Sequence, residues 1–387
     1  MRIVYVVNHV AFFVSHRLPI AQEMQGGGHE VSLATGQPGS QSMEAAALEE
    51  LKETGIPHTR LSFGTGANNI VAEIWGFFAL ICHFWRLRPD LVHCASPKAL
   101  LYGGIAARLC QVPALVLSVS GMGYAYTDDG RKSLSRKILA LLYGVAARYA
   151  FGHPNKRVIV QNLDDWTALK TAGYAAKDEL RLIHGSGVDL HSFAQVDHHQ
   201  KRPIVLFPAR ILRDKGALEF YQAARNLRTR VNGWRFLMAG AADYQNPSGV
   251  PDEMVKAWHN EGAIEWLGHV DDMTTLFRDA SIVCLPSYRE GLPKSLIEAA
   301  AAGCAVVTTD TIGCREAVVA GETGDLVPVR NAKALAEALL GLITDAPRRI
   351  RYGQAGVVLA GSRFDLAMVI SQHKQLYQEI SQQRQGV

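Results

Sequence analysis

Two glutamates eight positions apart are the residues of this sequence whose spacing best suits chemistry. Glu290 and Glu298 are separated by GLPKSLI, in which Gly291 permits a tight backbone and Pro293 suits the first position of a helix. The first N–H groups of that helix, at residues 294–296, could hold a phosphate with one carboxylate on either side. The spacing alone is equally compatible with a surface loop that leads into an Ala-rich core helix with solvated glutamates.

A pair of cations marks a second candidate site. The segment FPARILRDKG places Arg210 and Lys215 directly after an apolar run, at a strand-to-helix turn where a parallel sheet presents its ligand-binding edge. An arginine fork and a lysine point charge that converge there suit a diphosphate. Two solvated cations in a surface loop are the alternative, which weakens if the helix after Glu290 begins at the same edge of the same sheet.

The elements that position these residues form two α/β halves. Apolar runs such as RIVYVV, DLVHCAS and RPIVLFPAR alternate with helical stretches, a pattern that predicts right-handed β-α-β units and parallel sheets. A polar stretch over 188–203 separates the halves. We expect two Rossmann-like domains facing each other across a cleft, residues 1–190 and 191–362, and a C-terminal helix over 363–387 that crosses back to the first domain.

These motifs resemble those of family 4 glycosyltransferases, which are retaining enzymes with the GT-B fold. REGLPKSLIE resembles the E-x7-E element of that family, and PARILRDKG resembles its G-R-x-x-x-x-K-G element, with Ala209 where glycine is usual. HGSGVDLHSF is similar to the segment at the family's interdomain boundary. RPDLVHCASPKALLYGGIAARLCQVP, with SGMGYAYT after it, most resembles the bacterial subgroup that adds sugars to polyprenyl-diphosphate-linked oligosaccharides in surface polysaccharide assembly.

The resemblance implies a role for each residue of the two motifs. Arg210 and Lys215 would bind the nucleotide diphosphate and stabilise the leaving group, Glu290 would contact the transferred sugar, and Glu298 would bind the ribose hydroxyls. Fixed cations and a helix N-terminus can stabilise a departing diphosphate, and the sequence has no D-x-D, so neither a metal nor a cofactor is expected. The other donor-binding residues that the resemblance implies are Ser295, Leu296, Gly291 and Val270.

Three basic residues of the first half are candidates for the acceptor side. Relatives often show a second His after the strand that ends in DLVH, where this chain has Ala95, and the usual Gly-Gly pair is absent from NHVAFFVSHRLP. His93 fits a hydrogen-bonded core histidine better than an acceptor contact, and His16 fits both interpretations equally. Lys98 could meet an anionic acceptor diphosphate, although a lone Lys is more often solvated.

The composition limits the compartment and the partners. The chain has 387 residues, of which 48% are hydrophobic, with Lys+Arg 40 against Asp+Glu 36, which excludes a disordered chain and gives no sign of nucleic-acid binding. Six scattered cysteines indicate a reducing compartment, and the N-terminus lacks the pattern of a signal peptide. We therefore expect a cytoplasmic protein.

Two segments of the first half bear on membrane contact. Ile70–Trp85 is shorter than the ~20 residues that span a bilayer and contains a Glu and a His. Its five aromatic residues have helical spacing, so they pack in the core or form a face in the lipid interface, where Arg86 and Arg88 reach headgroups. The segment 133–149 is likewise amphipathic and basic. Together they favour peripheral contact with an anionic membrane, on the inner face of the cytoplasmic membrane.

We therefore expect a hexosyl- or N-acetylhexosaminyltransferase that moves a sugar, with retention, from a UDP-sugar to a lipid-linked or polysaccharide acceptor. Two alternatives stay open: an enzyme on the same fold, such as a UDP-sugar 2-epimerase or a phosphorylase, and a non-catalytic partner subunit. The E-x7-E element counts against an epimerase, and no pyridoxal-binding lysine of a phosphorylase can be placed. The intact motif residues Glu290, Glu298, Arg210 and Lys215 argue against a chain that has lost catalysis.

Overall fold

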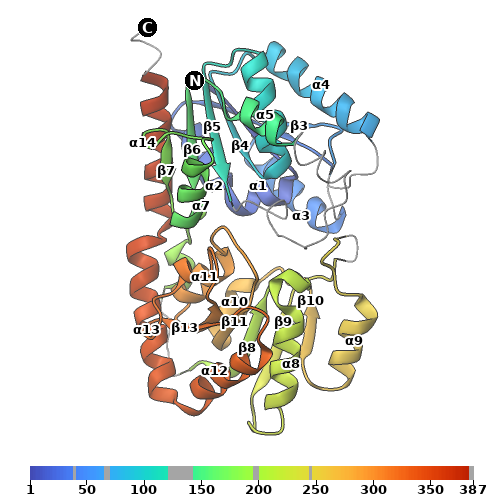
Figure 1. Ribbon diagram of the computed structural model, residues 1–387, viewed down its shortest axis with the longest axis vertical. Helices are drawn as coiled ribbons and strands as arrows, with labels where there is room; N and C mark the ends of the chain where they lie inside the picture. The colour runs from blue at the N-terminus through green and yellow to red at the C-terminus, as the bar shows by residue number, and fades with distance from the viewer. Residues whose placement is uncertain (38–40, 65–69, 121–142, 195–199, 244–245, 383–387) are drawn as a thin grey trace. The chain divides into compact units, whose positions relative to one another are not determined.

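The computed structural model describes residues 1–37, 41–64, 70–120, 143–194, 200–243 and 246–382 (Figure 1). Most of the basic amphipathic segment, with Arg136 and Lys137, lies outside the described residues, as does SGMGYAYT from its glycine onward. The membrane expectation attached to Arg136 and Lys137 therefore stays a prediction.

The chain divides into two compact units. The first comprises Met1–Ile183 with Ile370–Val387, and the second comprises His184–Val369. These divisions differ from the boundaries expected after residues 190 and 362, because the second unit already begins at His184 and keeps the first residues of the last helix. That helix, α14 (Leu366–Gln382), returns the chain to the first unit, as the sequence predicts.

The first unit contains a parallel sheet of seven strands within the described residues. Their order is β3-β2-β1-β4-β5-β6-β7, so the order reverses beside β1. The central strands are apolar and buried on both faces, which is typical of strands covered by helices on each side. The strands are β1 (Arg2–Val7), β2 (Glu30–Thr35), β3 (His58–Arg60), β4 (Leu91–Ala95), β5 (Ala114–Val119), β6 (Lys156–Val160) and β7 (Leu180–Leu182). The helices before α14 are α1 (Val10–His16), α2 (Leu18–Gly26), α3 (Gln41–Glu53), α4 (Ile70–Leu87), α5 (Pro97–Leu109) and α7 (Leu163–Thr171).

The second unit repeats this plan with six parallel strands, again counted over the described residues. Their order is β10-β9-β8-β11-β12-β13, so β8 lies between β9 and β11 at the point where the order reverses. Ligands of open α/β sheets bind at the carboxyl ends of the strands at such a point. The strands are β8 (Arg202–Pro208), β9 (Arg235–Ala239), β10 (Glu265–Gly268), β11 (Ala280–Leu285), β12 (Ala305–Thr309) and β13 (Gly324–Val327).

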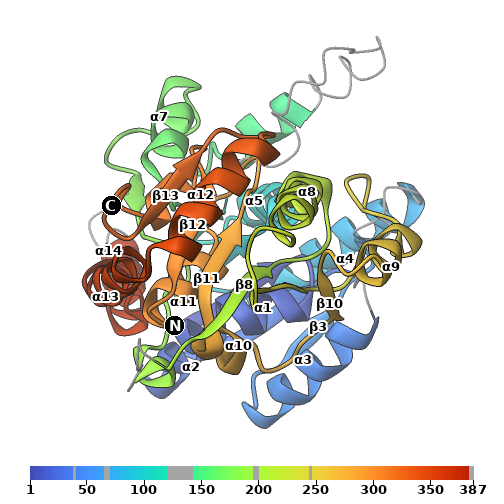
Figure 2. The same ribbon diagram turned by 90° about the horizontal axis from the view of Figure 1, so that it is seen from below.

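The helices of the second unit pack in pairs beside the sheet, α8 with α12 and α11 with α13 (Figure 2). Their bounds are α8 (Ala217–Leu227), α9 (Asp252–Asn260), α10 (Met273–Asp279), α11 (Lys294–Ala301), α12 (Ala332–Thr344) and α13 (Ala346–Arg363). Both units therefore have the doubly wound α/β architecture that the alternation of apolar runs predicts.

Helix α4 has two apolar faces with different environments. One face is buried in the first unit through Gly76, Leu80, His83 and Phe84. On the other face Trp75, Phe78 and Trp85 are 68%, 54% and 67% exposed, together with Ile70, Val71 and Ile74. Core packing is therefore right for Phe84 and wrong for these three aromatic residues. Within the described residues, α4 is also the one helix long and apolar enough to cross a membrane by length and composition.

Candidate active site

The loops that follow β8 and β11 bring Lys215 and Glu290 together. The Nζ atom of Lys215 lies 2.5 Å from Oε1 of Glu290, and the hydroxyl of Ser287 donates to the same oxygen over 2.7 Å. Both charged side chains are largely buried, with 24% and 12% of their surfaces exposed. Because β8 and β11 are neighbouring parallel strands, their carboxyl ends lie at one edge of the sheet. The structure thus places one residue of each sequence motif in a single ion pair.

A glycine permits the close approach of these two loops. Gly216 has a φ of +77°, and a Cβ atom there would lie 2.2 Å from the carbonyl oxygen of Pro286. The amide of Tyr288 donates to the carbonyl of Asp214 over 2.8 Å. Any side chain at residue 216 would force the loops apart and separate Lys215 from its partner.

A third loop, which follows β12, supports the backbone of Glu290. The amide of Glu290 donates to the carbonyl of Ile312 over 3.0 Å. Gly313 has a φ of +80°, and a Cβ atom there would lie 2.4 Å from the Glu290 carbonyl and 2.5 Å from that of Gly291. Gly313, not Gly291, has the left-handed backbone at this point. Our sequence reasoning missed Gly313, although a glycine shortly after the apolar run CAVVTT was a signal for it.

Arg210 follows β8 and pairs with a residue that follows β9. Its Nη1 atom lies 2.9 Å from Oδ2 of Asp243, in a pair that is 50% and 31% exposed. A Cβ atom at Gly240 would lie 2.0 Å from the carbonyl of Ala209, so glycine is required there for the loops to meet. The close backbone approach beside Arg210 is thus made through Gly240, while Ala209 stands where relatives usually have glycine. Both candidate cations are held by carboxylates at the same edge of the sheet.

Helix α11 begins four residues after Glu290 and carries Glu298. Burial raises the pKa of Glu298, an effect that Lys294 opposes from 3.5 Å. The side chain of Leu296 is fully buried, and its amide already donates to the carbonyl of Pro293 over 3.0 Å, so a phosphate at this amide would have to share it. Ser295 is partly exposed in the first turn of the helix. Val270, in the loop after β10, packs partly buried against the core of the second unit.

His93 lies inside the core of the first unit. Its Nε2 atom is 2.6 Å from the hydroxyl oxygen of Ser118, and its Nδ1 atom contacts the hydroxyl of Tyr377 on α14. Burial, and then the charge of Arg17, hold the pKa of His93 well below its usual range. The interpretation as a hydrogen-bonded core histidine is therefore right. Its place among the acceptor-side candidates is corrected, since a fully buried ring has no surface for an acceptor.

The other two acceptor-side candidates also have partners in the first unit. The ring of His16 stacks on that of Phe12 with centroids 4.6 Å apart, and its Nδ1 lies 3.2 Å from the Phe12 carbonyl oxygen. The Nζ atom of Lys98 lies 2.8 Å from Oε1 of Glu73, whose other carboxylate oxygen accepts a hydrogen bond from Tyr102 over 2.8 Å. Lys98 therefore connects α5 to α4, and its charge is matched by Glu73.

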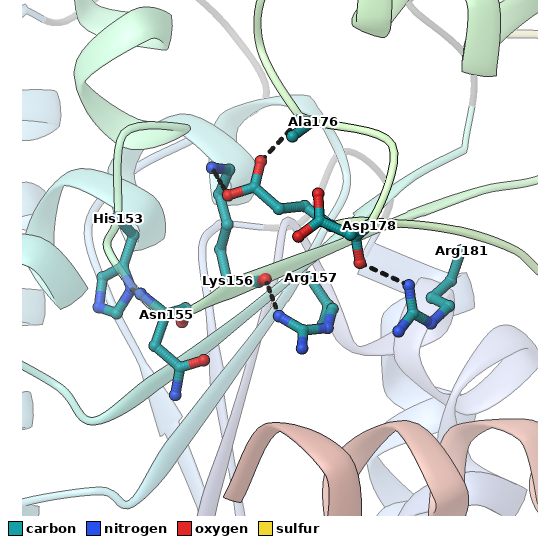
Figure 3. A network of polar contacts seen from close by, with 8 residues as sticks. His153, Asn155, Lys156, Arg157, Ala176, Asp178 and Arg181 are labelled. Atoms are coloured by element: carbon teal, nitrogen blue, oxygen red, sulfur yellow. Dashed lines mark hydrogen bonds and ion pairs between the residues drawn. The ribbon is translucent and has the colours of Figure 1, made fainter. Parts of the chain in front are cut away.

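A separate polar network surrounds the start of β6 in the first unit (Figure 3). Lys156 pairs with Glu179 over 2.6 Å, and Arg181 donates to the carbonyl of Asp178 over 2.7 Å. Both ring nitrogens of His153 lie 2.9 Å from backbone carbonyl oxygens. The contacts of Lys156 and Arg181 hold the β6–β7 connection in place, and those of His153 tie the segment before β6 to Val112. Across the residues the structure covers, no group of three or more His, Cys, Asp or Glu side chains could hold a metal ion.

Two protein-family models match the chain, one in each unit. Residues 15–167 match the glycosyl transferase 4-like domain, and residues 190–357 match glycosyl transferases group 1. The second match contains both motifs and the Lys215–Glu290 pair.

Curated relatives and solved structures agree with these matches. An N,N'-diacetylbacillosaminyl-diphospho-undecaprenol alpha-1,3-N-acetylgalactosaminyltransferase of Campylobacter jejuni is 27% identical over 98% of this chain and 99% of its own. The capsular polysaccharide biosynthesis glycosyltransferase CapM of Staphylococcus aureus is 22% identical over 82% of this chain and 84% of its own. Anabaena Alr3699/HepE, solved with UDP and glucose, superposes with a TM-score of 0.75 at 18% identity, covering 98% of this chain and 99% of its own. The chain therefore belongs to the GT-B glycosyltransferases in which a glycosyl transferase 4-like domain precedes a group 1 domain.

Proposed function

We propose that this glycosyltransferase moves a hexosyl or N-acetylhexosaminyl group from a UDP-sugar, with retention of configuration, to a lipid-linked acceptor. The observation that carries the proposal is the Lys215–Glu290 pair at the carboxyl edge of β8 and β11. Departure of UDP builds negative charge on the diphosphate, and preorganised cations stabilise that charge. Lys215 and Arg210 supply the cations. When the diphosphate binds Lys215 in place of Glu290, the Glu290 carboxylate can contact the sugar.

The nature of the donor is supported by a structural neighbour. The Anabaena protein of the same fold is described with UDP and with UDP and glucose. In this chain the first turn of α11 would face the phosphates through the amide of Ser295, and Glu298 would accept hydrogen bonds from the ribose. No metal takes part in this scheme.

The nature of the acceptor is supported by the Campylobacter relative, whose name specifies a sugar carried on diphospho-undecaprenol. A polyprenyl-diphosphate acceptor stays in the bilayer, so the enzyme must work at the membrane surface, on its cytoplasmic side. The exposed face of α4, with Trp75, Phe78 and Trp85, is the surface of the first unit that suits the lipid interface. The charged residues near that face are Arg86 and Arg88, both exposed, and they suit anionic headgroups.

Thermal protection by nucleotides tests the donor. We expect UDP to raise the unfolding temperature, whereas GDP and ADP at equal concentration leave it nearly unchanged. A nucleotide present at 100 times its Kd stabilises the folded state by about 2.7 kcal/mol, which is readily measured. Protection by GDP or ADP alone would contradict a UDP-sugar donor.

Two conservative substitutions test whether Glu298 binds the nucleotide and Glu290 contacts the transferred sugar. Glu298→Gln is expected to weaken the binding of free UDP, because its partner is the ribose. Glu290→Gln is expected to leave UDP affinity unchanged or higher, since Lys215 loses a competing carboxylate, while the transfer rate falls because the contact to the sugar is lost.

Isothermal calorimetry with UDP and a transfer assay on both variants separate these effects. Glu322→Gln, which alters an exposed glutamate of the same unit, is the matched control and should change neither quantity. Weaker UDP binding in Glu290→Gln with normal binding in Glu298→Gln would mean that the two roles are exchanged.

A further inference from the structure

A cavity of 490 Å³, with a mainly apolar lining that carries several polar side chains, lies beside the C-terminal half of α4, at the amino edge of the first unit's sheet. It is lined by the last turns of α4, the start of β1 and β2, and the end of α2. Its polar side chains include Arg2, His29, Thr59, His83 and Arg86. None of these residues belongs to the donor site, which is in the other unit.

His83 is the feature of this cavity that points to a ligand. The side chain is 7% exposed, and among the residues the structure describes its Nε2 atom has no hydrogen-bond partner. A buried polar atom without a partner is costly, so such atoms are usually paired by protein, water or a ligand. Burial, and then the charge of Arg86, lower the pKa of His83, so the ring is neutral near pH 7 and carries one N–H to donate.

The charges at the cavity favour an anion. Arg86 and Arg2 are both exposed, and Nη1 of Arg2 donates to the carbonyl of Leu87 over 2.8 Å, which fixes its guanidinium beside the end of α4. Glu30 is the acidic side chain in the lining, and it is exposed to solvent. Two guanidinium groups and an imidazole N–H are the donors with which proteins recognise phosphate.

Helix α4 contributes both to this cavity, through His83, Arg86 and Leu87, and to the exposed apolar face. Trp85, which is 67% exposed, directly precedes Arg86. In a phospholipid the phosphate lies just above the acyl chains, so a helix in the interface presents aromatic residues to the chains and neighbouring cations to the phosphates. We propose that this cavity binds the phosphate of an anionic phospholipid headgroup when α4 lies on the bilayer. This inference rests on the membrane contact proposed above.

Vesicle binding by three matched variants tests the headgroup site. The probes are vesicles of phosphatidylcholine alone and of phosphatidylcholine with phosphatidylglycerol. We expect His83→Leu to reduce binding to the phosphatidylglycerol vesicles about five-fold, although it removes no charge from the neutral ring. Arg86→Gln should reduce it at least as much. Lys170→Gln, which removes an exposed charge elsewhere in the first unit, should leave it unchanged.

Thermal unfolding distinguishes a binding role for His83 from a structural one. His83→Leu removes a buried atom that has no partner within the described part of the chain, so its unfolding temperature should equal or exceed that of the wild type. At constant ionic strength, glycerol 3-phosphate should compete with vesicles for the wild type and have no effect on His83→Leu. Saturable binding of glycerol 3-phosphate that leaves vesicle binding untouched would assign the cavity to a soluble phosphate and overturn the proposal.

The proposal of a headgroup site and the proposal of membrane contact through α4 can be disproved separately. If His83→Leu and Arg86→Gln bind vesicles like the wild type while Trp75→Ser does not, membrane contact through α4 stands and the headgroup site is overturned. If the folded wild type binds neither kind of vesicle at low salt, the membrane contact fails and this inference fails with it.

Discussion

Lys215→Ala is expected to lower turnover by roughly 10²–10³-fold, the scale for the loss of one preorganised electrostatic contact. The Nζ atom is held 2.5 Å from Glu290 in a largely buried position, so little reorganisation is needed when the diphosphate develops charge. The loop itself is fixed by backbone contacts at Gly216 and Tyr288, so the fold should persist without the lysine. Steady-state UDP release and circular dichroism measure the two quantities.

Loss of Lys215 also leaves the buried Glu290 carboxylate without its ion-pair partner, which could by itself lower turnover. A double variant separates this effect from the loss of the cation. Lys215→Ala/Glu290→Gln removes both charges of the pair. If an unpaired Glu290 causes part of the loss in Lys215→Ala, the double variant should lose less turnover than the product of the two single-variant losses. Lys333→Ala changes an exposed lysine on α12 and serves as the matched control. A folded Arg210→Ala/Lys215→Ala variant with wild-type turnover would contradict the assignment of both cations.

Trp75→Ser/Phe78→Ser is expected to leave the protein folded and to weaken vesicle binding by about 100-fold. Both side chains are more than half exposed, so little core packing is lost. Transfer of a large apolar side chain from water to an apolar environment is worth about 1.5–3 kcal/mol. Two such losses at the lower end of this range, about 3 kcal/mol, correspond to about 100-fold. Co-sedimentation with vesicles measures the partition, and thermal unfolding reports on the fold.

Two controls make this result specific to α4. Val358→Ser changes an exposed apolar residue on α13 of the other unit and should not affect vesicle binding. Phe84→Ala, on the buried face of α4, should destabilise the fold by about 3–5 kcal/mol. Unfolding of the Trp75→Ser/Phe78→Ser variant would show that these side chains belong to the core. A folded variant with undiminished binding would exclude this face as the membrane contact.

The sequence by itself determined the α/β architecture of both units and predicted the edge of the second sheet at which the two motifs lie. Runs such as LVHCA and ASIVCL are apolar throughout because their strands are buried on both faces of a parallel sheet. Local order also located the two motifs, since each directly follows a strand, and the loops after neighbouring parallel strands must meet at one edge. Lys215 and Glu290 are 75 positions apart, and only the pairing of β8 with β11 in the structure brings them together.

Only the tertiary structure decided what surrounds the individual side chains. His93 belongs to the core because Tyr377, 284 positions away, closes over it when α14 returns to the first unit. Spacing along α4 showed that its aromatic residues are periodic, but not that one apolar face would stay uncovered. The need for glycine at residue 313 likewise appears only when the Glu290 carbonyl approaches it from another loop. For His93 and Gly313 the deciding partner belongs to another element of the chain, and packing, which local pattern does not encode, selects it.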